Sequence, residues 1–353
     1  MTLNDRIIAF SNLGDFLSQF NEETPIKKVT VANNEIFFEK FETAIEQAQH
    51  KNGWFLPEQI RHAINQWSKA LTKENLKNWT NKYPINNNPK ANTVAIIMAG
   101  NIPFVGFHDL LSILITGNKT LIKPSSNDDK LIKILCEYLI TSYPEFKDLI
   151  EFTENKITGH DAIIATGSNN TARYFEYYFK NKPNIIRKNR NSIAVLTGKE
   201  TNEDLTALGE DIFRYYGLGC RSVSKIFVPK NYNFDNFYKA MFPYQDLIKH
   251  EKYTNNYDYN KAVYLMSEFK LLDNGFLILK EDKSYSSPIS SLFYEFYESY
   301  ENLGKKLTID KDLLQCVVNY PENINNVKFG QTQAPHLHDY ADNIDTIDFL
   351  LKI

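Results

Sequence analysis

Apolar residues recur every three or four positions through much of the first part of the chain. They include Ile7, Ile8, Phe10, Leu13, Phe16, Leu17 and Phe20, and later Ile60, Ile64, Trp67 and Leu71. This spacing places the apolar side chains along one face of a helix. We therefore expect residues 1 to about 90 to form amphipathic helices that pack on a core, followed by a linker over residues 84–89.

The pattern changes after this linker. Short apolar runs, typical of buried strands, alternate with helical patterns. The runs cover residues 93–99, 120–123, 161–165 and 193–196, and the intervening segments read as helices. Strand–helix–strand repeats joined by short loops predict a mostly parallel sheet with helices on both faces. The chain is thus expected to have an α/β fold.

Polar residues and glycines follow three of these strands, at Asn101, at 123–126 and at 167–168. Because parallel strands end at one edge of a sheet, these loops should lie close together, where such sheets bind ligands. Asn101 is placed like a helix N-cap, with Pro103 close to a first helical position. Ser126, three residues before Asp129, predicts a capping box. A Gly-x-Gly-x-x-Gly fingerprint is absent, so a nucleotide would bind in another mode.

A second candidate site lies in residues 215–228, where a helical pattern ends and an apolar strand begins. Gly217 and Gly219 allow a tight turn and leave the thiol of Cys220 without a bulky neighbour. A thiol in this position can attack a carbonyl carbon, and Arg221 and Lys225 could favour its thiolate form. The alternative is a buried structural cysteine at a helix end.

Composition narrows the class of protein. The chain has 353 residues, which favours two domains, and a net charge of −3, which gives no reason to expect a nucleic acid partner. Its three cysteines are far apart and lack metal-ligand spacing, so we expect no metal site and a reducing cytoplasm. The first residues lack a signal-like apolar run, and no uncharged run approaches membrane-spanning length.

Four motifs occur in an order that resembles the aldehyde dehydrogenase superfamily. They are Asn101 before a helix, Lys-Pro-Ser-Ser at 123–126, Thr-Gly-Ser at 166–168 and Gly-x-Gly-Cys at 217–220. More narrowly, the chain from about residue 93 to its end resembles the fatty-acyl-CoA reductases encoded with bacterial bioluminescence genes. Three segments carry this resemblance: Ala-Gly-Asn-Ile-Pro at 99–103, Ile-Ile-Arg-Lys-Asn-Arg-Asn-Ser at 185–192 and Gly-Leu-Gly-Cys-Arg-Ser-Val-Ser-Lys at 217–225.

The resemblance implies an aldehyde-dehydrogenase-like fold. Residues 1–188 would hold the helical N-terminal part and a Rossmann-like dinucleotide-binding domain. Residues 189–353 would form a second α/β domain with the catalytic cysteine, and its C-terminal tail could pack back on the first domain.

The resemblance also implies a role for each candidate residue. Cys220 would be the nucleophile, and the Asn101 amide with the Cys220 backbone N–H would form the oxyanion hole. Lys123 would hold the adenosine ribose or its phosphate. Gly167 and Ser168 would let a helix N-terminus approach the pyrophosphate. The remaining expected cofactor-binding residues are Ser125, Ser126 and Thr171.

Three departures from aldehyde-oxidising relatives refine this expectation. Residues 179–198, where those enzymes carry the glutamate that activates water, contain no Asp or Glu. Ser126 stands where NAD-preferring relatives often have glutamate, which favours NADPH over NADH because a serine does not repel the 2′-phosphate. Ser284 stands where relatives hold the nicotinamide ribose with glutamate.

The predicted function is reduction of a long-chain fatty acyl-CoA to the aldehyde, with CoA as the leaving group. Two alternatives remain: NAD(P)-dependent aldehyde oxidation, and a non-catalytic subunit that binds an acyl group or a nucleotide. The expected partners are the small-molecule acyl thioester and either a second copy of the chain or an acyl-transferring protein. We expect a cytoplasmic protein without a membrane span.

Overall fold

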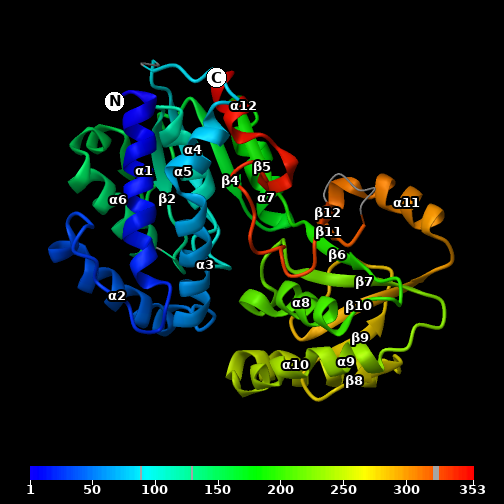
Figure 1. Ribbon diagram of the computed structural model, residues 1–353. Coiled ribbons are helices and arrows are strands. Elements are labelled where there is room, and N and C mark those ends of the chain that lie inside the picture. The colour runs from blue at the N-terminus through cyan, green and yellow to red at the C-terminus, as the bar shows by residue number, and fades with distance from the viewer. Residues whose placement is uncertain (88–89, 129, 321–325) are drawn as a thin grey trace. The chain divides into compact units, whose positions relative to one another are not determined.

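The computed structural model describes residues 1–87, 90–128, 130–320 and 326–353. These residues form two compact units, shown in Figure 1. Unit 1 comprises Met1–Lys188 and His336–Ile353, and unit 2 comprises Asn189–Pro335. Unit 1 is therefore assembled from two separate stretches of the chain.

Unit 1 begins with the amphipathic helices that the apolar spacing predicts. They are α1 (Leu3–Leu17), the short 3₁₀ helix η1 (Ser18–Phe20), α2 (Asn34–Lys51), α3 (Pro57–Ala70) and α4 (Lys73–Thr80). Thr2 and Asp5 form a capping box that satisfies backbone N–H groups at the start of α1. Phe10, Phe16 and Phe20 are fully buried, so the apolar face of this segment is the core-facing one.

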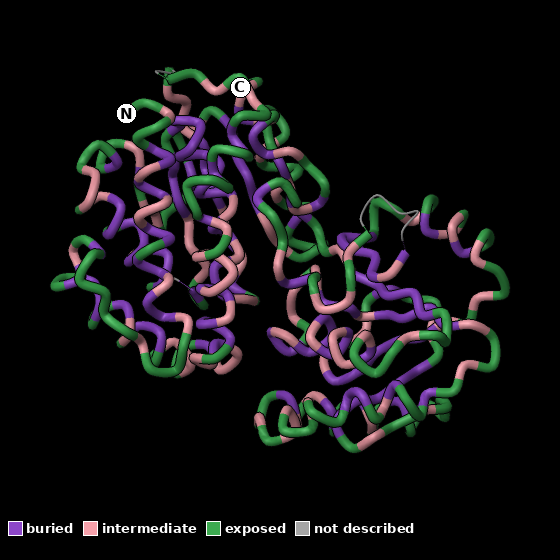
Figure 2. The backbone as a smooth tube through the Cα atoms, in the orientation of Figure 1, coloured by how far each residue is buried: buried purple, intermediate pink, exposed green. Residues whose placement is uncertain are grey.

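The sheet of unit 1 is parallel throughout and has the strand order β3-β2-β1-β4-β5. Its strands are β1 (Thr93–Ile97), β2 (Lys119–Lys123), β3 (Ile150–Phe152), β4 (Ala162–Thr166) and β5 (Asn184–Arg187). Its helices are α5 (Phe107–Ile115), α6 (Lys130–Ser142) and α7 (Asn169–Phe179), with a 3₁₀ helix η2 over Pro144–Asp148. Phe175 of α7 packs on Ala95, Ile163 and Ala165 of the sheet. In Figure 2 the strands appear as buried segments, and the helices around them carry both buried and exposed residues.

The predicted N-cap role of Asn101 is wrong. The helix that follows β1 begins at Phe107, with Gly106 as its N-cap residue. Between them Phe104 has a left-handed backbone with φ of 59°, which interrupts any helix. The predicted capping box from Ser126 cannot be described, because Asp129 lies outside the described residues, as do residues 88 and 89 of the predicted linker.

The C-terminal segment of unit 1, residues 336–353, contains the 3₁₀ helix η6 (Ala341–Asn343) and α12 (Thr346–Leu351). It is held to the helices of unit 1 by polar groups that are distant in sequence. The indole N–H of Trp79 donates to the hydroxyl of Tyr340 at 2.8 Å. The ring Nε2 of His108 lies 2.9 Å from the carbonyl oxygen of Leu337. These contacts make the segment part of the core of unit 1.

Unit 2 is built on a seven-stranded sheet with the order β12-β11-β6-β7-β10-β9-β8. Its strands are β6 (Asn191–Val195), β7 (Val223–Pro229), β8 (Leu271–Asp273), β9 (Ile278–Glu281), β10 (Ser291–Tyr297), β11 (Leu314–Val318) and β12 (Asn326–Val327). Only the pair of β8 and β9 is antiparallel among the described strand pairs. Its α-helices are α8 (Asn202–Phe213), α9 (Asp235–Met241), α10 (Glu251–Met266) and α11 (Tyr300–Ile309). Short 3₁₀ helices are η3 (Arg214–Gly217), η4 (Phe242–Lys249) and η5 (Lys311–Leu313).

Helices cover both faces of this sheet. On one face α8 and α9 contribute Leu208 and Phe237 to the larger apolar cluster. On the other face α11 contributes Leu303 and Leu307 to a second cluster with Val195 of β6. A mostly parallel sheet with both faces covered is the expected α/β architecture.

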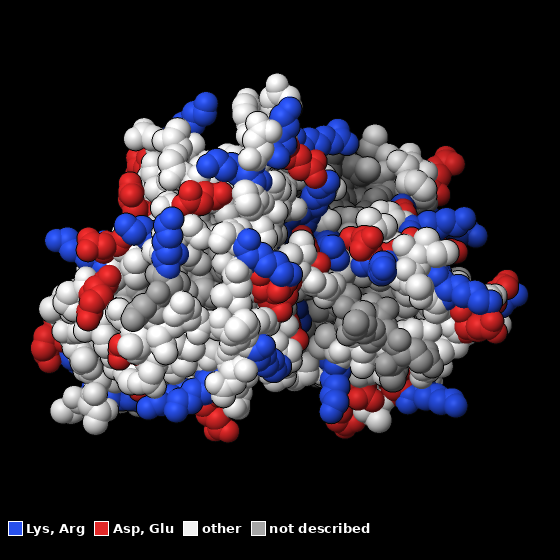
Figure 3. Space-filling model, turned by 90° about the horizontal axis from the view of Figure 1, so that it is seen from above, with Lys and Arg blue, Asp and Glu red and all other residues white. Residues whose placement is uncertain are grey.

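Charged side chains of both signs are interspersed over the surface. Figure 3 shows lysine and arginine mixed with aspartate and glutamate across the face it presents. This mixture agrees with the small net charge of −3. Among the described residues, no helix combines the length and apolar character that crossing a bilayer requires.

Candidate functional site

The strand order of unit 1 defines one edge at which its site residues gather. From β1 the chain proceeds to β2 and β3 on one side, and then returns to place β4 and β5 on the other. This reversal creates a topological switch point between β1 and β4, where open parallel sheets bind ligands beyond the carboxyl ends of their strands. The loops after β1, β2 and β4 carry Asn101, residues 123–126 and residues 167–168. Asn101 and five of the residues expected to bind the cofactor therefore lie at the carboxyl ends of three neighbouring strands.

The loops after β1 and β2 are in direct contact. The N–H of Met98 donates to the carbonyl of Lys123 at 3.0 Å, which extends the pairing of the two strands. A Cβ atom at Gly100 would lie only 2.3 Å from Oγ of Ser125, so this contact requires glycine. Asn101 follows directly and is exposed. The structure thus brings the Asn101 loop against the Ser125 loop.

The loop after β2 presents a cation and two hydroxyls. Lys123 ends β2, and its ammonium donates to the carbonyl of Asn155 at 3.2 Å. Ser125 Oγ accepts the N–H of Asn127 at 3.2 Å, which holds the loop in a local turn. Ser126 is exposed. These groups can donate to the oxygens of a ribose or a phosphate.

The loop after β4 leads into the N-terminus of α7. Ser168 is the N-cap, and its Oγ accepts the N–H of Thr171 at 3.3 Å. The Ser168 and Thr171 hydroxyl oxygens lie 3.0 Å apart. A Cβ at Gly167 would lie 3.0 Å from Cβ of Thr171, tighter than ordinary contact, so glycine lets the loop close onto the helix. The helix N-terminus carries partial positive charge suited to an anion.

In unit 2 the cysteine turn, residues 215–222, has an unusual backbone. After α8 ends, Tyr215, Tyr216 and Gly217 adopt left-handed conformations in succession, with φ of 53°, 57° and 75°. For a bulky residue this region is rare and costs about 1–3 kcal/mol, and such residues concentrate at functional sites. The chain then reaches Cys220. This residue is exposed, whereas Cys136 and Cys316 are buried.

Aromatic packing supports the left-handed residues. The ring of Tyr216 stacks on the ring of His250, with 4.6 Å between centroids and 28° between planes. His250 is the N-cap of α10, and its Nδ1 accepts the N–H of Tyr253 at 3.3 Å. Because Tyr216 is only 3% exposed, the residues packed around it hold its left-handed backbone in place.

The two cations that were expected to favour the thiolate are engaged with other groups. The ammonium of Lys225 is fully buried, pairs with Glu295 at 2.5 Å and donates to the carbonyl of Lys283 at 3.0 Å. Burial lowers the pKa of Lys225, and the bond to Glu295 opposes this effect. Arg221 donates from Nε to the carbonyl of Thr332 at 2.5 Å. Lys225 therefore holds strand β7 in place, and Arg221 holds the cysteine turn.

A buried carboxylate anchors the loop that meets Arg221. Asp211 of α8 accepts hydrogen bonds from the N–H of Gly330 and from both the N–H and hydroxyl of Thr332, at 2.7, 2.9 and 2.8 Å. Burial raises the pKa of Asp211 to about 6, although these bonds act in the opposite direction. The sequence analysis missed this residue. The sequence feature that could have revealed it is an acidic residue on the otherwise apolar face of α8, three residues after Leu208.

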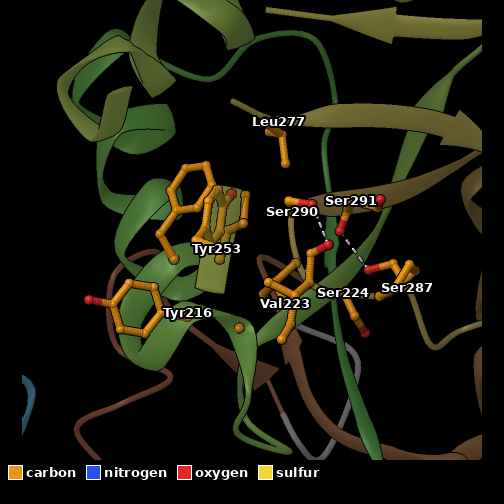
Figure 4. Close-up of a pocket in the computed structure, with 13 residues that line it drawn as sticks. Tyr216, Val223, Ser224, Tyr253, Leu277, Ser287, Ser290 and Ser291 are labelled. Carbon is orange, nitrogen blue, oxygen red and sulfur yellow. Dashed lines mark hydrogen bonds between the residues drawn. The ribbon is translucent and has the colours of Figure 1, made fainter. Parts of the chain in front are cut away.

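A small pocket of about 20 Å³ lies beside the cysteine turn, which is room for about one water molecule. Figure 4 shows Tyr216 and Tyr253 on one side of it and four serines on the other. These serines are Ser224, Ser287, Ser290 and Ser291. Ser284, which replaces the expected nicotinamide-ribose glutamate, is exposed in the loop that leads to Ser287, and its N–H donates to Asp282 at 2.8 Å.

The candidate residues are divided between the two units. Asn101, Lys123, Ser125, Ser126, Gly167, Ser168 and Thr171 belong to unit 1, and Cys220 belongs to unit 2. Within the described parts of the chain, no group of three or more His, Cys, Asp or Glu side chains is arranged to hold a metal ion.

Solved structures similar to this chain include several aldehyde dehydrogenases. Aldehyde dehydrogenase 21 from Physcomitrella patens, solved with the reaction product succinate, is similar with a TM-score of 0.64 and 11% identity, over 100% of this chain and 84% of that chain. Indole-3-acetaldehyde dehydrogenase AldA from P. syringae, solved with NAD+ and IAA, has a TM-score of 0.61 and 12% identity, over 92% and 73%. An NAD+ complex of aldehyde dehydrogenase from Bacillus cereus has a TM-score of 0.60 and 14% identity, over 92% and 73%.

At these identities the likeness establishes the fold, which confirms the expected aldehyde-dehydrogenase-like architecture. Among curated proteins, none matches the chain in sequence. The family model described as acyl-CoA reductase (LuxC) matches residues 38–277. Because this match spans more than half of the sequence and agrees with the motifs around Asn101 and Cys220, the chain belongs to the acyl-CoA reductase (LuxC) family.

Proposed function

We propose that this protein reduces a long-chain fatty acyl-CoA to the fatty aldehyde with NADPH, and that Cys220 carries the acyl group as a thioester. One observation carries the proposal. In a chain of this family, Cys220 alone of the three cysteines is exposed, on a turn built from consecutive left-handed residues. All three cysteines lie in described parts of the chain.

In the first step the Cys220 thiolate attacks the thioester carbon of the acyl-CoA. A bond forms between Sγ and this carbon, the bond to the CoA sulfur breaks, and CoA leaves as a thiolate. The Asn101 amide and the Cys220 backbone N–H are assigned to the oxyanion that develops during this exchange. Donors directed at developing charge are usually the largest single catalytic contribution.

NADPH, when bound, supplies a hydride to the same carbon. The sulfur–carbon bond then breaks, the aldehyde leaves, and the Cys220 thiolate is restored. The acyl-enzyme must outlast attack by water until this second step. The absence of Asp and Glu from residues 179–198 supports this, because general-base activation of water contributes about 10²–10⁴-fold to such reactions.

The residues of unit 1 fit a dinucleotide. Gly100 and Gly167 both lie where a Cβ atom would crowd a neighbouring loop or helix, so the backbone at the switch point is closely packed and low in side-chain bulk. We assign Lys123 and Ser126 to the adenosine ribose and its 2′-phosphate, with Ser125 beside them. The N-terminus of α7, with Ser168 and Thr171, is assigned to the pyrophosphate.

The proposal is tested by intact-protein mass spectrometry after incubation with palmitoyl-CoA in the absence of NADPH. We expect one palmitoyl group on the wild type and on Cys136→Ala, which changes a buried cysteine of unit 1, and none on Cys220→Ala. Addition of NADPH should remove the adduct and release palmitaldehyde. An unmodified wild type, or an adduct that persists in Cys220→Ala, contradicts the proposal.

The same samples address the predicted alternatives. Consumption of aldehyde with NAD+ or NADP+ and no CoA would indicate aldehyde oxidation instead. An adduct formed only from an acylated partner protein, and not from free acyl-CoA, would identify an acyl-transferring partner. Homo-oligomer formation and a cytoplasmic location stay predictions.

A further inference from the structure

Ser192 lies at an irregularity shared by two strand pairs. It is on β6, which runs between β7 and β11 in the sheet of unit 2 (Figure 1). Ser192 pairs with Val223, yet the next residue, Ile193, pairs with Lys225, so β7 has one extra residue here. The pairing of β6 with β11 also shifts around this point, between Leu314 and Val317. Extra residues disrupt the regular exchange of backbone hydrogen bonds.

The side chain of Ser192 bridges both sides of this irregularity. Its hydroxyl donates to the carbonyl of Cys220 at 2.9 Å and accepts the backbone N–H of Cys316 at 3.1 Å. Ser192 is 0% exposed, so water does not compete for these bonds. A hydroxyl is suited to this place because one oxygen atom can donate and accept at once.

The bridge acts on the peptide group that follows the Cys220 Cα atom. The peptide group that precedes it is held as well, because the carbonyl of Gly219 accepts the N–H of Ser222 at 3.0 Å. In a trans peptide the N–H points opposite to the C=O, so this second bond also directs the Cys220 N–H away from Ser222. With both flanking peptide planes held, the φ and ψ angles of Cys220 are set, and these angles determine the direction of its Cα–Cβ bond.

We propose that Ser192 is a positioning residue for Cys220: its hydroxyl, tied to Cys316, holds the Cys220 backbone so that the thiol and the adjacent N–H keep the geometry needed for acyl transfer. This inference rests on the proposed function, in which Cys220 is the nucleophile. Ser192 itself touches neither substrate nor cofactor in this role. Misplacement of reacting groups by about 1 Å can cost about 10²-fold in rate.

The test compares Ser192→Ala with the wild type in a single-turnover reaction with palmitoyl-CoA and no NADPH, followed by intact mass. We expect the rate of Cys220 acylation to fall by about 10- to 100-fold. The final extent should remain one acyl group per chain, because the folded protein still holds its nucleophile. A purely structural defect has the opposite signature, since it lowers the extent of acylation and leaves the rate of the remaining folded fraction unchanged.

Ser112→Ala is the matched control. Ser112 is 0% exposed like Ser192, but it lies on α5 of unit 1, where its hydroxyl donates to the carbonyl of His108 at 2.8 Å. This variant should acylate within about twofold of the wild type, since it also loses a buried hydroxyl–carbonyl hydrogen bond but leaves the peptide groups on either side of Cys220 unchanged. Ser192→Thr, which keeps the hydroxyl, should restore most of the rate.

Several outcomes would overturn the inference. One is a Ser192→Ala protein that acylates within twofold of the wild type, and another is a Ser192→Thr protein with the wild-type melting temperature and the slow rate of Ser192→Ala. If Ser192→Ala does not fold, Ser192→Cys decides, because its weak S–H donor keeps the side-chain shape. A threefold or greater slowing supports the inference, and a wild-type rate contradicts it. A wild type without any adduct instead rejects the proposed function.

Discussion

The two units place their candidate residues at opposite ends of strands. In unit 1 the residues assigned to the cofactor follow the strands β1, β2 and β4, in loops that lead into helices. In unit 2 the proposed nucleophile Cys220 comes before its strand, β7, on a turn that follows a helix. The first arrangement is what a parallel sheet offers to any ligand at its switch point. The second arrangement is not a property of the sheet and depends on the conformation of the turn itself.

This difference appears in the backbone. The unit 1 site is formed by strand-to-helix loops whose described residues contain a single left-handed bulky residue, Phe104, and glycine at Gly100 and Gly167 where neighbours approach closely. The cysteine turn instead needs two left-handed tyrosines, the Tyr216–His250 stack and the Ser192 bridge. A strained backbone conformation at a functional site persists only where the surrounding packing enforces it. We therefore expect the cysteine turn to tolerate substitution less well than the cofactor loops.

The largest expected effect tests whether unit 1 contributes to chemistry as well as to cofactor binding. Asn101→Ala should lower the rate of Cys220 acylation by about 10²–10³-fold, the usual cost of removing one oxyanion donor. The binding of NADPH, measured by fluorescence titration, should change little. Single-turnover mass spectrometry gives the acylation rate.

The control for this prediction is Asn127→Ala, which removes an exposed asparagine from the neighbouring loop of unit 1. It should acylate at the wild-type rate. If Asn101→Ala acylates as fast as this control, unit 1 serves only to bind the cofactor, and the assignment of Asn101 to the oxyanion is wrong.

A smaller effect is expected at Ser126, which is assigned to the 2′-phosphate of NADPH. Ser126→Glu places a carboxylate there, so KM for NADPH should rise by at least about tenfold through like-charge repulsion. KM for NADH should change much less. Glutamine has the size of glutamate without its charge, so KM of Ser126→Gln for NADPH should resemble that of the wild type. Equal losses for Glu and Gln, read from initial rates at varied cofactor, would indicate a steric effect and remove the basis for NADPH preference.

The smallest effect is expected for two glycines, one in each unit, that have nearly the same left-handed backbone conformation. Gly217 of the cysteine turn and Gly159 of unit 1 have φ of 75° and 74°, and each is glycine in the left-handed region. Replacement of either by alanine should lower the free energy of unfolding by about 1 kcal/mol, measured with urea. Only Gly217→Ala should also slow acylation. Equal slowing by Gly159→Ala would show that global stability, and not the local turn, controls the rate.

The regular part of the fold follows from the apolar pattern. The apolar runs predicted at 93–99, 120–123 and 161–165 coincide within two residues with β1, β2 and β4, because a strand buried on both faces needs an unbroken apolar run. The edge strands β3 and β5 were not predicted. They are only 3 and 4 residues long, and β5 ends in Arg187, whose buried guanidinium pairs with Asp109. That partner is 78 residues away and has no local signature.

The site was predictable where single residues carry chemistry and less so where the backbone does. Cys220 and its exposure follow from glycines before a thiol. The left-handed Tyr215 and Tyr216 do not, because bulky residues rarely adopt this conformation and only tertiary packing enforces it. Ser192 was visible only as part of a family motif. Its role depends on shifts in strand register, which no apolar pattern encodes.

The discontinuity of unit 1 has a consequence for biosynthesis. Residues 336–353 emerge from the ribosome only after residues 189–335 have been made. Until then Trp79 and His108 lack the tail contacts provided by Tyr340 and Leu337. Domains usually fold in the order in which they are translated. Here the unit that starts first is completed last, so a nascent chain carries an unfinished N-terminal core while its cysteine-bearing half can already fold.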